Sequence, residues 1–167
     1  MDYGMIGKIE KSKRYAQEPQ RVTLHSLEVE FKGDNNTYQV SLNDAGWQCS
    51  CPGYAQHKIC PHIMSLERLL RPMLKREPLP YAPGQNVVSD VEKAKGYAEE
   101  LEHRIRFVAF NAQFRGGHND YTINYEDGVW HCDNPYFTSR GVCSNTMAME
   151  RILKGMVKPL TMPVPIE

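Results

Sequence analysis

The sequence predicts an α+β fold made of two similar lobes, and three observations predict it. The chain has 167 residues, and its residues 21–70 recur in similar form at residues 104–153. Each repeat shows the period-two alternation of β-strands, flanked by short helical segments. A proline-rich stretch separates the repeats, and proline there cannot continue a helix. We therefore expect each lobe to hold a short helix, a small antiparallel sheet and a C-terminal helix.

The repeat is clearest in the cysteines. The step along the chain from Cys49 to Cys132 equals the step from Cys60 to Cys143, and we call this step the repeat offset. When residues 21–70 are aligned with residues 104–153 at this offset, 14 of the 50 positions are identical. Chance would give roughly 3 at typical composition. The alignment needs no gap, which indicates a tandem duplication.

The first elements of the first repeat follow from local patterns. A helical segment at 9–16 is expected to end before Pro19, because proline removes a helical hydrogen bond. Alternating apolar residues predict one strand at 27–31 and another at 38–42. The turn residues at 33–36 predict a hairpin between these two strands.

The end of the repeat is predicted in the same way. A second turn at 43–46 leads to a strand that carries Trp47 and Cys49. Pro61 suits the first turn of the C-terminal helix, where its missing amide hydrogen is not needed. The second repeat shows the same order of patterns.

The domain boundaries follow from the repeat and from proline content. We expect a first domain at 1–83 and a second at 89–167. The linker at 77–88 holds three prolines and suits an extended connection. The last residues, 158–167, also hold three prolines and form a similar tail.

Composition excludes several classes of protein. Lys and Arg number 20, as do Asp and Glu, so the chain lacks the basic excess of a general nucleic-acid binder. No apolar run has the length of a membrane span, and the N-terminus does not resemble a signal peptide. We expect an intracellular protein, cytoplasmic or nucleoid-associated. Because no phosphate-binding loop, H-E-x-x-H or G-x-S-x-G motif is present, we expect neither an enzyme nor a small-molecule substrate.

The first repeat contains a metal-ligand pattern, C-x-C-x8-C-x-H. Its members are Cys49, Cys51, Cys60 and His62. Three thiolates and one imidazole satisfy tetrahedral zinc, so we expect one Zn²⁺ per chain. A closed ligand shell leaves no place for water, so the predicted role is structural. His57 lies inside the loop and could compete as a ligand, but a surface position is favoured.

This pattern resembles a known family. Residues 47–52 and 60–63 closely resemble the SWIM zinc finger, and residues 11–16, 21–22 and 38–40 look like the lead-in of bacterial SWIM proteins. SWIM fingers occur in Swi/Snf-type ATPases, Mutator-type transposases, kinase-linked ubiquitin ligases and recombination accessory proteins. The resemblance implies binding to DNA or to proteins.

The second repeat departs from the pattern. Its four corresponding residues are Cys132, Asn134, Cys143 and Asn145. Asparagine is a poor zinc ligand beside thiolates, so we expect a degenerate finger without metal. The two asparagines could hydrogen-bond across the former site, and the two cysteines could form a disulfide under oxidation. Asp133 or His131 could replace a ligand, but their positions predict that they point elsewhere.

Charge differs between the repeats. Residues 1–83 hold 11 basic and 9 acidic residues, whereas residues 84–167 hold 9 and 11. Five basic residues are predicted near the first finger: Lys58, Arg68, Arg71, Lys75 and Arg76. A second basic cluster consists of Lys8, Lys11, Lys13 and Arg14. These residues predict either a phosphate-binding surface on the first repeat or solvated helix faces.

We expect a non-catalytic zinc-binding module that binds nucleic acid, with DNA as the favoured ligand, or that binds protein partners. Its expected setting is as an accessory subunit of a DNA-processing or other multi-subunit complex. The alternative is a protein–protein adaptor or a structural subunit of a larger assembly. The neutral net charge weakens the DNA reading, and fold analogy alone does not decide between them.

Overall fold

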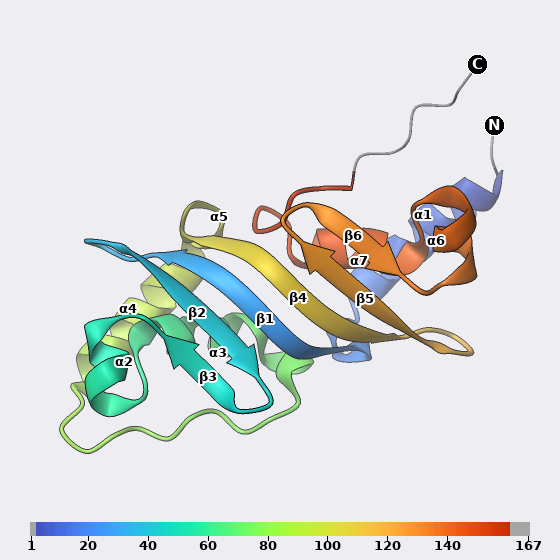
Figure 1. The fold of residues 1–167 in the computed structure, drawn as a ribbon. Coiled ribbons are helices and arrows are strands. Elements are labelled where there is room, and N and C mark those ends of the chain that lie inside the picture. The colour runs from blue at the N-terminus through green and yellow to red at the C-terminus, as the bar shows by residue number, and fades with distance from the viewer. Residues whose placement is uncertain (1–2, 161–167) are drawn as a thin grey trace.

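The computed structural model describes residues 3–160 and contains one six-stranded antiparallel sheet (Figure 1). The strand order is β3-β2-β1-β4-β5-β6. The strands are β1 (Val22–Lys32), β2 (Thr37–Asn43), β3 (Gly46–Cys49), β4 (Ile105–Arg115), β5 (Asp120–Glu126) and β6 (Val129–Cys132). The α+β class is confirmed, but the sheet is continuous where the sequence predicts a small sheet in each lobe. Pairing of β1 with β4 covers two long edges that would otherwise stay open.

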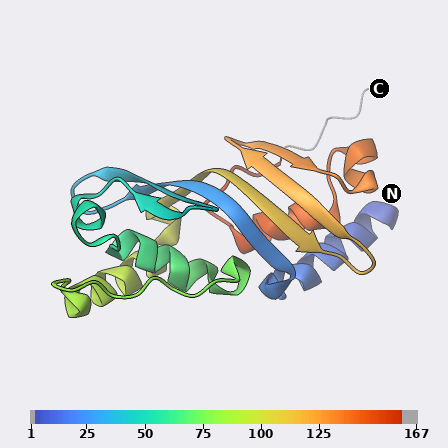
Figure 2. The same ribbon diagram turned by 60° about the horizontal axis from the view of Figure 1, so that its bottom comes forward.

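Helices cover one face of this sheet, and the other face is open (Figure 2). The helical elements are α1 (Tyr3–Ala16), η1 (Pro19–Arg21), α2 (Pro52–His57), α3 (Pro61–Leu74), α4 (Val87–Glu99), α5 (Leu101–Arg104), α6 (Pro135–Arg140) and α7 (Ser144–Ile152). The covered face is apolar: Phe31, Phe107 and Phe114 are fully buried there together with Leu66 of α3 and Met149 of α7. None of the helices between Tyr3 and Leu160 has the length and apolar character needed to cross a membrane.

Secondary structure recurs at the repeat offset of the sequence. Strand β4 matches β1 in length, β5 matches β2 and β6 matches β3, and each begins one repeat offset after its counterpart. The short helices α2 and α6 are related by the same offset, and so are the first residues of α3 and α7. The predicted strands, turns and helix start at Pro61 are therefore all present in the first repeat, and their counterparts are present in the second.

The central pair of strands is symmetric about one pair of residues. Leu27 of β1 lies opposite Phe110 of β4, and the repeat offset relates these two residues to each other. Moving outward, the pairing skips His25 on one strand and Val108 on the other, which the same offset relates. The register therefore looks the same from either strand, with an equivalent bulge at each side of the centre.

The first helix of each repeat packs against the C-terminal helix of the other repeat, an arrangement that we call the helix exchange. α1 lies against α7, and α4 lies against α3 (Figure 1). The side chain of Arg151 on α7 donates to the Ser12 hydroxyl of α1 at 3.3 Å. The reason lies in the central pairing: β1 begins opposite Phe114, the last residue but one of β4, so the helix that precedes β1 emerges beside the second repeat. The sequence instead predicts that each lobe keeps its own first helix.

Two halves of the molecule therefore differ from the two repeats of the sequence. We call residues 17–104 the finger half, because they include the Cys3His cluster. We call residues 3–16 and 105–160 the asparagine half, because they include Asn134 and Asn145. The proline-rich tail predicted at 158–167 lies, beyond Leu160, outside the described residues.

Candidate metal centre

The ends of three elements bring the four predicted zinc ligands together. Cys49 is the last residue of β3, Cys51 is the N-cap of α2, and Cys60 is the N-cap of α3. His62 is the second residue of α3. Two of the sulfurs accept backbone amides at the helix starts, where the helix dipole favours negative charge. The chain thus uses helix N-termini to hold sulfur atoms at one point.

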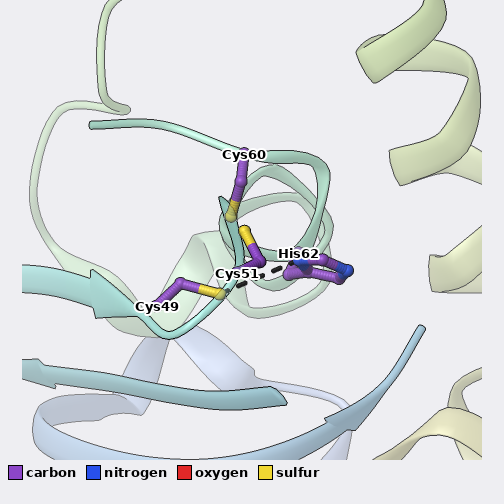
Figure 3. Close-up of side chains that lie close together, drawn as sticks. All are labelled: Cys49, Cys51, Cys60 and His62. Carbon is purple, nitrogen blue, oxygen red and sulfur yellow. Dashed lines mark hydrogen bonds between the residues drawn. The ribbon is translucent and has the colours of Figure 1, made fainter. Parts of the chain in front are cut away.

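The distances fit a single tetrahedral ion. The four ligand atoms all lie within 4.8 Å of one another, and all four residues are buried (Figure 3). The Cys49 Sγ atom is 3.8 Å from His62 Nδ1. Ligand atoms around tetrahedral zinc are about 3.5–3.8 Å apart, given its bond lengths. The cluster is therefore a Cys3His site for one Zn²⁺, in which four protein ligands satisfy tetrahedral coordination.

The thiols themselves show why a cation belongs here. The pKa of Cys51 is lowered, because Cys49 and Cys60 hydrogen-bond to its sulfur, with further help from His62. The pKa of Cys49 is raised to about 11 by its hydrogen bond to the Cys51 sulfur, and the pKa of Cys60 is raised by hydrogen bonds to Cys49 and Cys51, with burial adding to both. Three thiolates this close repel one another unless a cation lies between them. A zinc ion held by Cys49, Cys51, Cys60 and His62 would supply that charge, and the three thiols would lose their protons.

Aromatic rings enclose the histidine ligand. The His62 ring lies 4.9 Å from the ring of Phe31 and 4.8 Å from that of Tyr38. Tyr97, on α4 of the second repeat, stacks on it at 5.6 Å. A Cβ atom at Gly33 would come within 3.2 Å of His62 Nε2, so the backbone approaches the imidazole closely. These contacts fix the ring orientation with which Nδ1 faces the sulfurs.

Tyr97 is a site residue that the sequence reasoning did not find. Its hydroxyl donates to Asp34 Oδ2 at 3.1 Å, and the Arg104 guanidinium lies 4.6 Å above its ring. Burial, and then the Asp34 charge, raise its pKa, so the hydroxyl stays protonated at neutral pH. Ala94, Tyr97 and Ala98 recur at helical spacing, which predicts an apolar face, but only the packing of α4 against α3 puts that face on the finger.

The corresponding residues of the second repeat also meet, and they interact through amides. Asn134 is the N-cap of α6, and its Oδ1 accepts the Tyr136 amide at 2.9 Å. Its Nδ2 donates to Asn145 Oδ1 at 2.8 Å, so the predicted hydrogen bond across the site is confirmed. The Cys143 thiol lies 3.8 Å from the same oxygen of Asn145. Hydrogen bonds here occupy the place of the coordination bonds in the first repeat.

The neighbouring side chains of the second repeat point away, as predicted. Asp133 Oδ1 accepts the backbone amide of Thr122 at 2.8 Å, and the exposed His131 ring packs 6.1 Å from that of Phe137. Within residues 3–160, the four ligands of the first repeat are the one group of His, Cys, Asp and Glu close enough to hold a metal, and His57 is not among them.

Cys132 and Cys143 are both free thiols. A hydrogen bond between them, with Cys132 as donor, is the main cause that lowers the pKa of Cys143 to about 7. Their oxidation to a disulfide stays a prediction.

The five basic residues predicted near the first finger do not form one patch. Lys58 ends α2 and lies over the Tyr54 ring, whereas Arg68 and Arg71 line a hollow beside the linker residues Pro78–Tyr81. Lys75 Nζ donates to the backbone carbonyls of Gln20 and Pro72, at 2.7 and 2.8 Å. Arg76 is exposed beyond the helix end.

The second basic cluster, Lys8 to Arg14, lies on α1 and therefore on the asparagine half. The sequence places it with the first repeat, and the helix exchange corrects that placement.

Comparison with protein families supports the metal centre. Residues 38–70 match the family model of the SWIM zinc finger, which spans β2, β3, α2 and most of α3. Neither the curated proteins nor the solved structures give a match to the chain. Fold and site together thus define a zinc-binding module of the SWIM type within the chain.

Proposed function

We propose that this protein is a non-catalytic, zinc-stabilised module that binds nucleic acid, with DNA as the expected ligand. Its proposed setting is as an accessory subunit of an intracellular DNA-processing complex. The observation that carries the non-catalytic part is the closed Cys3His site. Four protein ligands fill tetrahedral zinc, and catalytic zinc sites keep an open position. The ion then serves to hold β3, α2 and α3 together. Free buried thiols suit a reducing compartment, in keeping with an intracellular location.

We also propose that the second repeat is a degenerate SWIM finger that arose by tandem duplication. The repeat offset relates the strands, the short helices and the bulges of the central pair. Asn134 and Asn145 stand where Cys51 and His62 stand in the first repeat. Hydrogen bonding between them accounts for a finger-like loop that needs no metal.

Nucleic-acid binding is tested with the zinc-loaded full chain. Fluorescence anisotropy at low salt would compare labelled duplex DNA, single-stranded DNA and RNA. We expect DNA binding that weakens as salt rises, because phosphate contacts release counterions. Absence of binding to all three probes in low salt would overturn the proposal and favour the alternative below.

The alternative is a protein–protein adaptor or assembly subunit, and the open face of the sheet favours it. A shallow hollow of about 480 Å³ lies there across the central strands. Its lining includes Ser26 and Glu28 from β1 with Ala109 and Asn111 from β4, in equivalent positions. Capture of partners from the native host, with and without nuclease, separates the two functions: an adaptor keeps its partners after nuclease.

A further inference from the structure

The helix exchange changes how charge is distributed over the molecule. The finger half, residues 17–104, holds 10 basic and 12 acidic residues, a net charge of −2. The asparagine half, residues 3–16 and 105–160, holds 10 basic and 6 acidic residues, a net charge of +4. The sequence repeats suggest the opposite sign for each, because α1 counts there with the first repeat. The positive side of the folded molecule is the one without the Cys3His cluster.

Most of this charge gathers on α1 and at the adjoining end of α7. The cations of this surface, which we call the α1–α7 basic face, are Lys8, Lys11, Lys13, Arg14, Arg151 and Lys154. On the described parts of these two helices the acidic residues are Glu10 and Glu150. Glu10 is exposed and lies 3.4 Å from Lys13, whereas Glu150 is partly buried and accepts the Leu160 amide. Positive charge therefore dominates the solvent side.

Lys8 and Lys11 are half-buried at the edge of the packed side of α1, and Lys13 and Arg14 are exposed. Ser12 and Tyr15 are buried on the inner side of α1, and Tyr15 packs 5.4 Å from Phe114 of the sheet. Lys8 lies over the Tyr136 ring at 5.0 Å. Lys8, Lys11 and Arg14 follow at intervals of three residues, so each is about 4.5 Å further along the helix axis. The result is a row of cations on a rigid helix.

The equivalent surface of the finger half, on α4 and α3, carries Arg68 and Arg71 at the positions of Arg151 and Lys154, but its basic and acidic residues balance. Helix α4 takes the place of α1 there, and it carries Asp90, Glu92 and Glu99 beside Lys93 and Lys95. Lys95 pairs with Glu92 at 3.9 Å. Opposite charges at such spacing cancel at a distance, so α4 offers no comparable attraction for a polyanion.

We propose that the α1–α7 basic face is the surface that binds the phosphate backbone of DNA, on the half of the molecule without the zinc finger. This inference rests on the proposed function and changes where binding is located. Arg151 and Lys154 line a hollow of about 580 Å³ between α1 and α7, whereas Lys8, Lys11 and Arg14 lie outside it. A row of cations on a helix recognises charge density, which a phosphate backbone supplies continuously. The zinc finger then stabilises the fold and does not itself carry the main contact surface.

The test uses two matched triple variants of the full, zinc-loaded chain. One variant is Lys8→Gln, Lys11→Gln and Arg14→Gln on the α1–α7 basic face. The other is the control, with the same loss of charge at Arg71→Gln, Lys93→Gln and Lys95→Gln on the finger half. Binding of a labelled DNA duplex is measured by anisotropy over a salt series. Circular dichroism and zinc content show that both variants are folded and loaded.

We expect the first variant to lose affinity by about tenfold or more. The slope of its plot of log K against log salt should become less negative by about 2–3, because three phosphate contacts are lost. The control keeps the wild-type affinity and slope. Equal losses in both variants, or an unaffected first variant, would overturn the assignment of the surface. If the wild type binds no nucleic acid, the proposed function fails and this inference with it. If polyglutamate competes as well as unlabelled DNA, the face recognises acidic protein and not DNA.

Discussion

The two halves of the sheet build the same backbone around different chemistry. In the finger half, Cys49, Cys51, Cys60 and His62 converge within bonding range of one ion. In the asparagine half, an Asn134–Asn145 hydrogen bond joins the same two loops. Structural zinc contributes on the order of 10 kcal/mol of apparent binding energy, and a hydrogen bond about 1 kcal/mol. Under the relation we propose between the repeats, a hydrogen bond holds in one half the loop geometry that metal coordination holds in the other, and the metal-binding half gains far more energy from that coordination.

The largest effect expected from this comparison is that of Cys60→Ser against Cys143→Ser. Cys60→Ser leaves three ligands and an open position, so we expect loss of zinc and a fall in unfolding free energy of at least about 4 kcal/mol. Cys143→Ser should cost about 1 kcal/mol, because no coordination bond is lost. Denaturant unfolding and elemental analysis measure both. Equal damage would mean that the second site holds a metal or a disulfide.

A double substitution should make the two halves alike. Asn134→Cys with Asn145→His recreates C-x-C-x8-C-x-H on a loop of the same length. We expect two zinc ions per chain in place of one, and a gain of a few kcal/mol, because coordination outweighs the lost hydrogen bond. Elemental analysis with wild type as the reference gives the count. A wild-type count of two, or a double variant that still binds one, contradicts the proposed relation between the halves.

A smaller effect is expected where the backbone approaches the histidine ligand. At Gly33 an added Cβ would lie 2.9 Å from the Tyr38 ring and 3.2 Å from His62 Nε2. Gly33→Ala should therefore cost about 1–3 kcal/mol and weaken zinc binding. Gly53→Ala is the control, because nothing lies within 4 Å of its Cβ and the position is helical. Competition with a chelator measures zinc affinity; identical affinities for the two variants would show that Gly33 does not position the imidazole.

The smallest effect on stability is expected from two carboxyls, one in each half, and it should be the same for both. Burial raises the pKa of the Glu67 carboxyl and of the Glu150 carboxyl, two residues that the repeat offset relates. A carboxyl with a raised pKa in the folded state costs stability as pH rises through that pKa, and the cost is absent below the unfolded value. Glu67→Gln and Glu150→Gln should each stabilise the protein at pH 7.5 by less than about 1 kcal/mol, and the gain should shrink toward pH 5.

Thermal unfolding of wild type and both glutamine variants across this pH range gives the two difference curves. Similar curves would show that the halves differ in their metal chemistry and not in their general packing. A pH-independent difference for either variant would mean that its carboxyl is not the group responsible.

The metal centre was predictable because its information is local. Four ligands in a fixed spacing specify their own geometry, and the hydrogen bond between the Asn134 and Asn145 side chains follows from placing the second repeat on the first. The single sheet was not predictable, because the alternation in β1 shows which side chains are buried and not which strand lies beside it. The helix exchange depends on that same pairing, which is why Lys8 and its neighbours were assigned to the wrong half.

The contact between α1 and α7 joins distant parts of the chain, which delays it during synthesis and folding. Ser12 and Arg151, which join these helices, are 139 residues apart in the chain. At 5–20 residues per second, Ser12 of α1 is synthesised roughly 7–30 s before Arg151 of α7. During that time α1 lacks its contact with α7, and for most of it also the contact of Tyr15 with Phe114 of β4. Helix α1 is thus open to a chaperone during synthesis, and its docking should be among the last steps of folding.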